Sequence, residues 1–342
     1  MTAYRYTSLT RIASFGTESF VERAIDFDRW ASGDYVVCTV EDSGGFRSIE
    51  LPDGRMSELA PGDVLVAALG RRHATLEATG SFEVVGEEGK MHLLTSAGLV
   101  GALTSKAPQL PPLVTLCYRG HVMVDNEKTT MRSVAIKVVP HRYDTPTVLL
   151  VGTSMAAGKT TAGKMAVRQL KRAGLRVAGA KLTGAGRYRD ILAYADAGAD
   201  AIFDFVDVGL PSTVLPEEEY QEALEDLLSH LARAEADVAV VEVGASPMEP
   251  YNGETAIRAV GDHVVATLLA ASDPYAAYGV MEAFGTRPTL ICGRATNTIG
   301  GIELAERLCG IPALNLADAS ASEALGRVLL ERLDQVASME TA

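Results

Sequence analysis

The sequence predicts an α/β protein in which a smaller β-rich domain precedes a larger domain built on a mostly parallel, doubly wound sheet. Two observations predict the larger domain. A fully apolar run, residues 148–151, leads directly into a loop that ends in Gly-Lys-Thr. Apolar runs of strand length then alternate with amphipathic segments of helix length as far as the C-terminus. A third observation predicts the β-rich domain: before residue 140, short β-type runs recur with turn signals about every ten residues.

Composition is that of a folded protein outside the membrane. The chain has 342 residues, of which 47% are hydrophobic and 22% charged, and its net charge is −13. This charge argues against nucleic acid or an anionic membrane as a general partner. No apolar run is long enough to span a bilayer, and the N-terminus lacks the pattern of a secretory signal. We therefore expect a soluble, cytoplasmic protein. Its four cysteines are too widely spaced for a zinc site or a disulfide framework: Cys38, Cys117, Cys292 and Cys309.

Residues 1–143 form the predicted N-terminal domain. Strands are expected at residues 35–40, 64–69, 113–118, 120–124 and 131–139. Residues 47–51 are expected to pair back on residues 35–40 as a hairpin across the Ser43-Gly44-Gly45 turn. Short strands at this spacing indicate a compact barrel or sandwich.

Residues 144–342 form the predicted C-terminal domain, in which strands and helices alternate. The expected strands are residues 147–151, 176–181, 237–243, 264–270, 289–292 and 313–316, and residues 203–206 form a strand or a turn. The expected helices are residues 160–173, 190–198, 217–236, 274–284, 301–309 and 319–337. Such alternation implies right-handed crossovers, with ligands bound beyond the carboxyl ends of the strands.

The loop after the first strand of this domain has the chemistry of a phosphate-binding P-loop. Glycines at 152 and 158 allow a tight turn, the ammonium of Lys159 can contact β- and γ-phosphates, and the hydroxyl of Thr160 can bind Mg²⁺. The following helix directs its positive end at the same phosphates. Thr153 stands where the usual pattern has a glycine. The residues expected to contact the nucleotide are Gly152, Thr153, Ser154, Met155, Ala156, Ala157, Gly158, Lys159, Thr160 and Thr161.

Two further charged residues are expected at the same edge of the sheet. Lys181 ends the second strand of the domain, and Glu242 lies at the end of the apolar run that begins at Val238. Glu242 is a candidate second ligand for Mg²⁺, or else a solvated charge at the end of a strand. Lys181 is a candidate for contacting the γ-phosphate and an anionic substrate, or else a surface lysine. We predict that Lys159, Lys181 and Glu242 form the catalytic group.

Polar loops after these strands are candidates for substrate and base recognition. Residues 183–213 form a charged insert, and residues 246–253 form a loop after Glu242. The candidate substrate-binding residues in these two loops are Arg187, Arg189, Asp204, Asp207, Glu249 and Tyr251. Arginine suits a carboxylate or phosphate group, although charged loop residues are often only solvated. Arg294 and Asn297 follow a later strand and are candidates for contacting the nucleobase.

Three short segments of the predicted C-terminal domain resemble segments of the dethiobiotin synthetase family. Residues 152–160, Gly-Thr-Ser-Met-Ala-Ala-Gly-Lys-Thr, resemble that family's G-T-x-x-x-x-G-K-T loop, which has the same spacing. Residues 179–181 are similar to the segment with its second-strand lysine, and residues 241–245 to the segment with its metal-binding glutamate. Leu182 stands where the family has a proline, and Gly244 comes one residue later than its glycine. The resemblance implies an ATP-dependent, carboxylate-activating P-loop enzyme with Mg²⁺, and it does not extend to the substrate of dethiobiotin synthesis.

The order of domains also resembles the bacterial DUF1611 family, one branch of which is described as D-glutamate N-acetyltransferase-like. That resemblance is one of organisation and implies an N-acyltransferase that uses the loop for an acyl-CoA.

We therefore predict an ATP- and Mg²⁺-dependent ligase that activates a small carboxylate-bearing metabolite by phosphoryl transfer and forms an amide or related C–N bond. No guanine-binding N-K-x-D segment follows a strand, which favours ATP over GTP. The alternatives are a small-molecule kinase, an N-acyltransferase, and a nucleotide-dependent switch or chaperone ATPase. The expected partners are an amino or carboxylic acid substrate and a second copy of the chain in a homodimer.

Overall fold

The structure is a computed structural model that describes residues 3–15, 19–45 and 47–340, and it divides the chain into two compact units. The first unit contains Met1–Lys137, Gly184–Arg189 and Phe205–Ala223. The second contains Val138–Thr183, Asp190–Asp204 and Leu224–Ala342. Two segments from the C-terminal half of the sequence therefore belong to the first unit.

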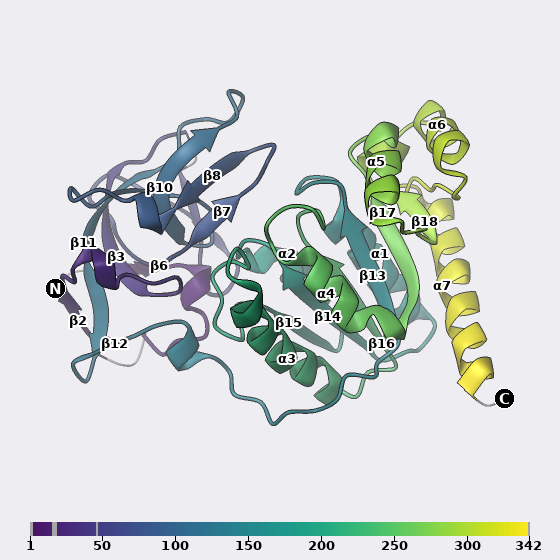
Figure 1. The fold of residues 1–342 in the computed structure, drawn as a ribbon, viewed down its shortest axis with the longest axis horizontal. Coiled ribbons are helices and arrows are strands. Elements are labelled where there is room, and N and C mark those ends of the chain that lie inside the picture. Colours follow the sequence, from purple (N-terminus) through teal and green to yellow (C-terminus); the bar gives the residue numbers. More distant parts are fainter. Residues whose placement is uncertain (1–2, 16–18, 46, 341–342) are drawn as a thin grey trace. The chain divides into compact units, whose positions relative to one another are not determined.

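The first unit is built on a mixed β-sheet that closes on itself (Figure 1). Its strands are β1 (Tyr4–Tyr6), β2 (Val21–Arg23), β3 (Tyr35–Asp42), β6 (Val64–Leu69), β7 (Arg71–His73), β8 (Ala78–Ser81), β9 (Lys90–Leu93), β10 (Leu99–Lys106), β11 (Thr115–Val124) and β12 (Glu127–Lys128). Hydrogen bonds join β3 to β6, β6 to β10, β10 to β9, β9 to β11, and β11 back to β3. This closed ring is a small barrel, as the spacing of the predicted strands indicates.

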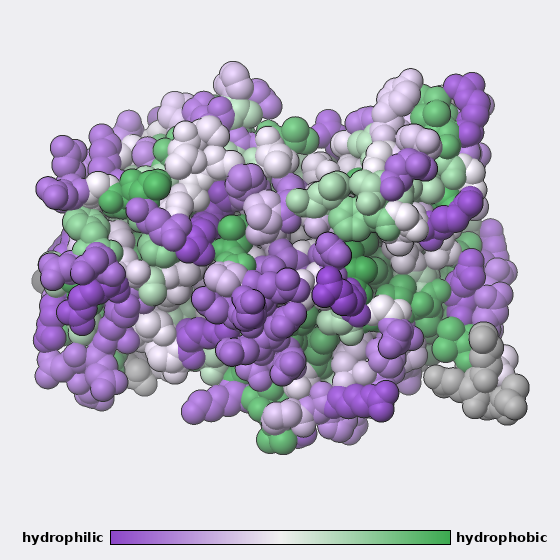
Figure 2. Space-filling view, in the orientation of Figure 1, coloured by the Kyte–Doolittle hydropathy of each residue, from purple (hydrophilic) through white to green (hydrophobic). Residues whose placement is uncertain are grey.

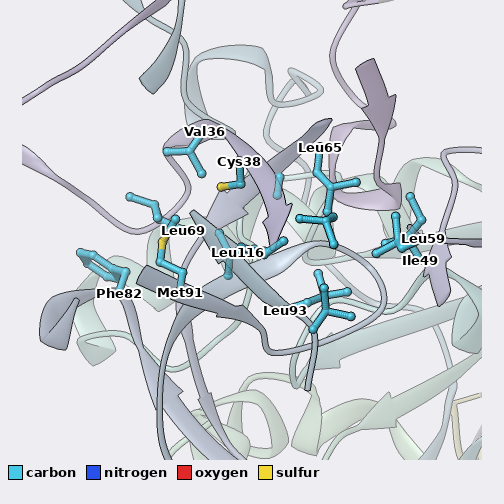
Figure 3. Close-up of a cluster of buried hydrophobic side chains, with 14 of the residues drawn as sticks. Val36, Cys38, Ile49, Leu59, Leu65, Leu69, Phe82, Met91, Leu93 and Leu116 are labelled. Carbon is cyan, nitrogen blue, oxygen red and sulfur yellow. The ribbon is translucent and has the colours of Figure 1, made fainter. Parts of the chain in front are cut away.

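Apolar side chains fill the interior of the barrel (Figure 3). In β3 the inward residues alternate, because successive side chains of a strand point to opposite faces. The core residues drawn from three strands are Val36, Cys38, Val40, Leu65, Ala67, Leu69, Met91 and Leu93. Burial of this apolar surface is the main contribution that holds the unit together.

Two predicted features of this unit are wrong. Residues 47–51 do not pair back on β3; instead β4 (Ser48–Glu50) pairs forward with β5 (Met56–Glu58) across the turn at residues 52–54. The apolar pattern of residues 131–139 also forms no strand, and only a short 3₁₀ turn, Arg132–Val134, is present. Ile136 and Val139 are exposed there. In both places an apolar pattern indicates extended chain but does not determine which strand, if any, lies beside it.

The second unit is built on six parallel strands. They are β13 (Thr147–Gly152), β14 (Val177–Thr183), β15 (Ala201–Asp204), β16 (Val238–Val243), β17 (Val264–Ala270) and β18 (Leu290–Cys292), in the order β15-β14-β16-β13-β17-β18. Their carboxyl ends lie at one edge of the sheet, which confirms the predicted doubly wound class. Among the described residues, no helix has the length and apolar composition needed to cross a bilayer.

The helices of the C-terminal half cover this sheet. They are α1 (Lys159–Arg172), α2 (Tyr188–Ala195), α3 (Glu217–Arg233), α4 (Gly253–Val260), α5 (Pro274–Phe284), α6 (Ile299–Cys309) and α7 (Ala319–Glu340). Helix α1 packs on β13 and its neighbours and against α7, and α4 lies in front of the sheet in Figure 1. Two expectations differ from the structure. The predicted strand at residues 313–316 is reduced to a single bridge between Ala313 and Ile291, and α4 has no counterpart among the predicted helices.

Candidate functional site

The turn between β13 and α1 has the geometry of a P-loop. Strand β13 is fully buried between β16 and β17 and ends at Gly152. A Cβ atom at Gly152 would lie 2.8 Å from the Nζ atom of Lys159, so only glycine lets this lysine fold back over the loop. Gly158 has φ +112°, which side-chain-bearing residues rarely adopt. Both glycines are therefore required by the path of the loop and the place of Lys159.

Lys159 is almost fully buried at the start of α1. Its ammonium donates hydrogen bonds to the backbone oxygens of Ser154 and Ala245, each at 2.7 Å. Burial lowers the pKa of Lys159, and the neighbouring carboxylate of Glu242 partly opposes this shift. The ammonium is thus held at the mouth of the loop, close to the end of β16.

Thr160 and Glu242 meet as the sequence predicts. The Thr160 hydroxyl donates a hydrogen bond of 3.0 Å to Oε2 of Glu242. A hydroxyl and a carboxylate oxygen are hard ligands of the kind that Mg²⁺ takes together with phosphate oxygens and water. No group of three or more His, Cys, Asp or Glu side chains that could hold a metal exists among the described residues. The donor set therefore fits a cation bound jointly with a phosphate ligand, and Thr160 and Glu242 would hold it.

Lys181 lies beside Glu242, because β14 and β16 pair with these two residues in register. On its other side it is in register with Asp204 of β15, which is also buried. Its ammonium donates to Oδ2 of Asp190 at 2.5 Å. Burial would lower the pKa of Lys181, but Asp190 and Glu242 raise it above its ordinary value. The structure thus brings Lys159, Thr160, Lys181, Asp204 and Glu242 to one edge of the sheet.

The loop after β16 also reaches this edge. Backbone N–H of Ser246 donates to Oε2 of Glu249 at 2.8 Å, and Glu249 is close enough to act electrostatically on Lys159. Tyr251 is fully buried in the same loop. Its predicted contact with substrate, like that of Glu249, stays a prediction.

The segment after β18 lies against the P-loop. Backbone N–H of Arg294 donates to the oxygen of Ala157 at 3.2 Å, and the position of a Cβ on Gly158 would be 3.1 Å from Cα of Gly293. The side chains of Arg294 and Asn297 are exposed. This placement beside the loop suits the predicted contacts with a nucleobase.

The charged insert is divided between the two units. Arg187, Arg189 and Asp207 belong to the first unit, whereas Asp204 belongs to the second. The two arginine side chains are exposed, and Asp207 accepts a hydrogen bond of 2.7 Å from the guanidinium of Arg11. Of these four residues, Asp204 is the one that belongs to the same unit as the phosphate-binding residues. Binding of substrate by Arg187, Arg189 and Asp207 remains a prediction from the sequence.

Two residues at the site were not predicted to act there. Asp190 holds Lys181, and the hydroxyl of Tyr194 donates to Oε2 of Glu242 at 3.2 Å. Both lie on α2, four residues apart, and therefore on one face of that helix. This spacing is visible in the sequence, but the partner of that face is not.

No protein-family model and no curated protein matches this sequence. Solved structures are similar to it in fold. The signal recognition particle receptor FtsY from Elizabethkingia anophelis is 15% identical, with 58% of this chain and 67% of that chain covered and a TM-score of 0.38. HypB from Helicobacter pylori, solved in complex with nickel, is 15% identical, with 56% and 89% covered and a TM-score of 0.37.

A DUF1611 family protein from Anabaena variabilis is 14% identical, with 57% of this chain and 61% of that chain covered and a TM-score of 0.37. These similarities concern the fold alone. The likeness to dethiobiotin synthetase stays a prediction from the three short segments.

Proposed function

We propose that the second unit is an ATP- and Mg²⁺-dependent enzyme that transfers the γ-phosphoryl group of ATP to the carboxylate of a small metabolite and then forms an amide or related C–N bond. The observation that supports this most directly is the hydrogen bond of 3.0 Å between Thr160 and Glu242, with Lys159 and Lys181 beside it. Phosphate, metal and substrate chemistry would meet at this single group of side chains.

The loop supports the binding of nucleoside triphosphate. Helix α1 directs its N-terminus at the turn of residues 153–158, and helix N-termini favour phosphate. Lys159 places a buried positive charge at the same turn. Exposed Arg294 and Asn297, on the segment that touches the loop, would contact the base. Mg²⁺ held by Thr160 and Glu242 would neutralise charge on the phosphate oxygens.

Lys181 supports transfer to an acceptor in addition to binding of nucleotide. Phosphoryl transfer requires positioning and charge stabilisation more than a dedicated base. A second buried ammonium, paired with Asp190 on one side and in register with Glu242 on the other, can bridge the γ-phosphate and an attacking carboxylate. The carboxylates of Asp190, which is bonded to Lys181, and of Asp204, which is in register with it, would suit an amine. A substrate that has both a carboxylate and an amine would match both signs of charge.

The experiment is calorimetric titration with ATP, GTP and acetyl-CoA in Mg²⁺, followed by product analysis with a panel of small amino and dicarboxylic acids. We expect ATP to bind, and ADP and phosphate to be released in step with a new amide. Binding of acetyl-CoA with no binding of either nucleotide would contradict the proposal.

The same assay separates the alternatives that use this loop. A stable phosphorylated product would indicate a kinase. Slow hydrolysis that responds to no metabolite but is stimulated by a protein partner would indicate a switch. Preference for GTP over ATP would overturn the choice of nucleotide and leave the phosphoryl-transfer chemistry standing.

A further inference from the structure

Tyr194 is a buried tyrosine whose hydroxyl reaches the carboxylate of Glu242. Only 1% of this side chain is exposed, and its hydroxyl donates to Oε2 of Glu242 at 3.2 Å. The Thr160 hydroxyl donates to the same oxygen.

The space for this ring is made by two glycines on different elements. A Cβ atom on Gly163 of α1 would lie 2.1 Å from the Tyr194 hydroxyl oxygen. A Cβ atom on Gly179 of β14 would lie 2.7 Å from Cδ2 of the ring. Real Cβ atoms are essentially never found at such distances, so any side chain at either position would displace the tyrosine. The ring therefore occupies a slot that α1 and β14 leave open.

Helix α2 makes a second contact with the site through the same face. Asp190, one turn before Tyr194, accepts the hydrogen bond of Lys181 at 2.5 Å. Two side chains of α2 therefore form hydrogen bonds with charged groups of the candidate site: Asp190 with Lys181, and Tyr194 with Glu242.

We propose that Tyr194 is a positioning residue that fixes the carboxylate of Glu242 for binding of the Mg²⁺–nucleotide complex, while Asp190 on the same helix fixes Lys181. The inference rests on the proposed nucleotide-dependent function. A hydrogen bond to a ligating carboxylate from a residue that does not itself contact the metal orients that carboxylate, and its loss weakens metal binding. Thr160 is itself a candidate ligand of the cation, whereas Tyr194 is not, so the Tyr194 hydroxyl can hold Glu242 with or without the cation.

The test is Tyr194→Phe, which keeps the ring in its slot and removes only the hydroxyl. Affinity for ATP is measured by calorimetry in EDTA and over a series of Mg²⁺ concentrations. We expect unchanged affinity in EDTA and a roughly tenfold higher Mg²⁺ concentration for half of the metal-dependent gain in affinity. The matched control is Tyr143→Phe, which removes another buried tyrosine hydroxyl of the same unit, bonded to Thr147. The control should keep the wild-type Mg²⁺ dependence.

A second variant tests the slot without changing the tyrosine. Gly163→Ala should move the hydroxyl away from Glu242 and raise the Mg²⁺ requirement in the same direction as Tyr194→Phe. Gly300→Ala on α6 is its control, because no atom lies within 4 Å of the added Cβ. Thermal unfolding of each variant verifies that it is folded.

The outcomes separate the two proposals. Failure of the wild-type protein to bind any nucleoside triphosphate would contradict the proposed function. Binding of ATP–Mg²⁺ by the wild type, with the same Mg²⁺ dependence in Tyr194→Phe, would overturn the positioning role alone. An equal loss of affinity with and without Mg²⁺ would also overturn it, because that result would mean a general structural effect. Asp190→Asn should leave the Mg²⁺ requirement unchanged, and a rise equal to that of Tyr194→Phe would contradict the separate tasks given to the two residues.

Discussion

Lys159 and Lys181 are both buried at the candidate site, yet their surroundings shift their pKa values in opposite directions. Lys159 bonds to two backbone oxygens, and its burial lowers its pKa. Burial also disfavours the charged form of Lys181, but Asp190 and Glu242 raise its pKa above the ordinary value. Of the two ammonium groups, Lys159 is therefore the first to lose its charge as the pH rises.

Nucleotide affinity should fall in alkaline solution before an ordinary lysine would titrate. Lysine attracts phosphate in its protonated form, which prevails below its pKa, and the pKa of Lys159 is lowered from 10.5. Affinity should therefore decrease as the pH rises through this lowered value. Calorimetry with ATP from about pH 7 to about pH 10 measures the profile.

The free energy of unfolding should also depend on the titration of Lys159, but it should rise with pH where nucleotide affinity falls. Because the folded-state pKa of Lys159 lies below its unfolded value, the unfolded chain binds more protons between the two values, and the free energy of unfolding rises with pH there. The control for the affinity profile is Lys159→Arg, which keeps its positive charge over the whole pH range. An identical alkaline loss of affinity in that variant would assign the effect to another group.

Removing the Lys159 ammonium should abolish detectable nucleotide binding. Truncating one partner of a buried charge interaction typically costs about 2–5 kcal/mol. Lys159→Ala is compared with Lys164→Ala, a partly exposed lysine on the same helix, by calorimetry with ATP. Equal affinities in the two variants would contradict the role of Lys159.

The residues whose convergence on one edge of the sheet could be predicted from the sequence are those at element boundaries. Lys159 begins α1, while Lys181 and Glu242 lie near the ends of strands, and parallel strands bring such positions together. Tyr194 could not be predicted in the same way. It is 48 residues from Glu242 in the sequence, and its contact depends on where the C-terminal end of α2 packs.

At the scale of elements, β6 is the most enclosed strand of the first unit. All six of its residues are buried, and it pairs with β1, β3 and β10. Its continuous apolar run is what a strand covered on both faces requires. It therefore closes the barrel as well as filling its interior.

Leu65→Ala in β6 should lower the free energy of unfolding by about 2–5 kcal/mol, because it opens a cavity in a filled core. Leu76→Ala is the matched control, since Leu76 is 63% exposed. Urea unfolding of both variants gives the comparison. A loss in Leu65→Ala no larger than in the control would show that the barrel interior tolerates the cavity.

Hydrophobic patterns predicted the existence of elements better than their partners. Residues 264–270 and 274–284 coincide with β17 and α5. The predicted hairpin between β3 and residues 47–51 was wrong, because alternation gives the same signal whichever neighbour completes the pairing. Helix α4 was missed because a loop with two prolines precedes it, and it begins after Asn252, which adopts the left-handed conformation.

At the scale of the whole molecule, the first unit depends on segments from beyond residue 180. Glu50 is fully buried, and its carboxylate accepts hydrogen bonds from the hydroxyl of Ser8 and from the backbone N–H groups of Tyr188 and Arg189. All four residues belong to the first unit. The predicted boundary at residue 143 was placed where short β-type runs give way to alternating strand and helix patterns. This contact could not be predicted in that way, because nothing in residues 184–189 marks them as part of the β-rich unit.

Glu50→Gln should destabilise the protein by about 1–3 kcal/mol, since hydrogen bonds to a charged, buried acceptor are lost or weakened. Glu58→Gln, at an exposed position in the paired strand, is the control. Denaturant unfolding and amide hydrogen exchange at Tyr188 and Arg189 measure the effect. Unchanged exchange at these two amides would contradict the holding role of Glu50.

The order in which the chain passes between the units has a consequence for its synthesis. The first unit lacks Gly184–Arg189 and Phe205–Ala223 until the ribosome has translated residue 223. By then β13, α1 and β14 of the second unit have already been made. Domains of many proteins fold one after another as they leave the ribosome, N-terminal first. Here the N-terminal unit cannot be completed first, because its last two segments are made after part of the second unit. A nascent chain stalled near residue 180 would contain every strand of the barrel but would lack these two segments of the first unit.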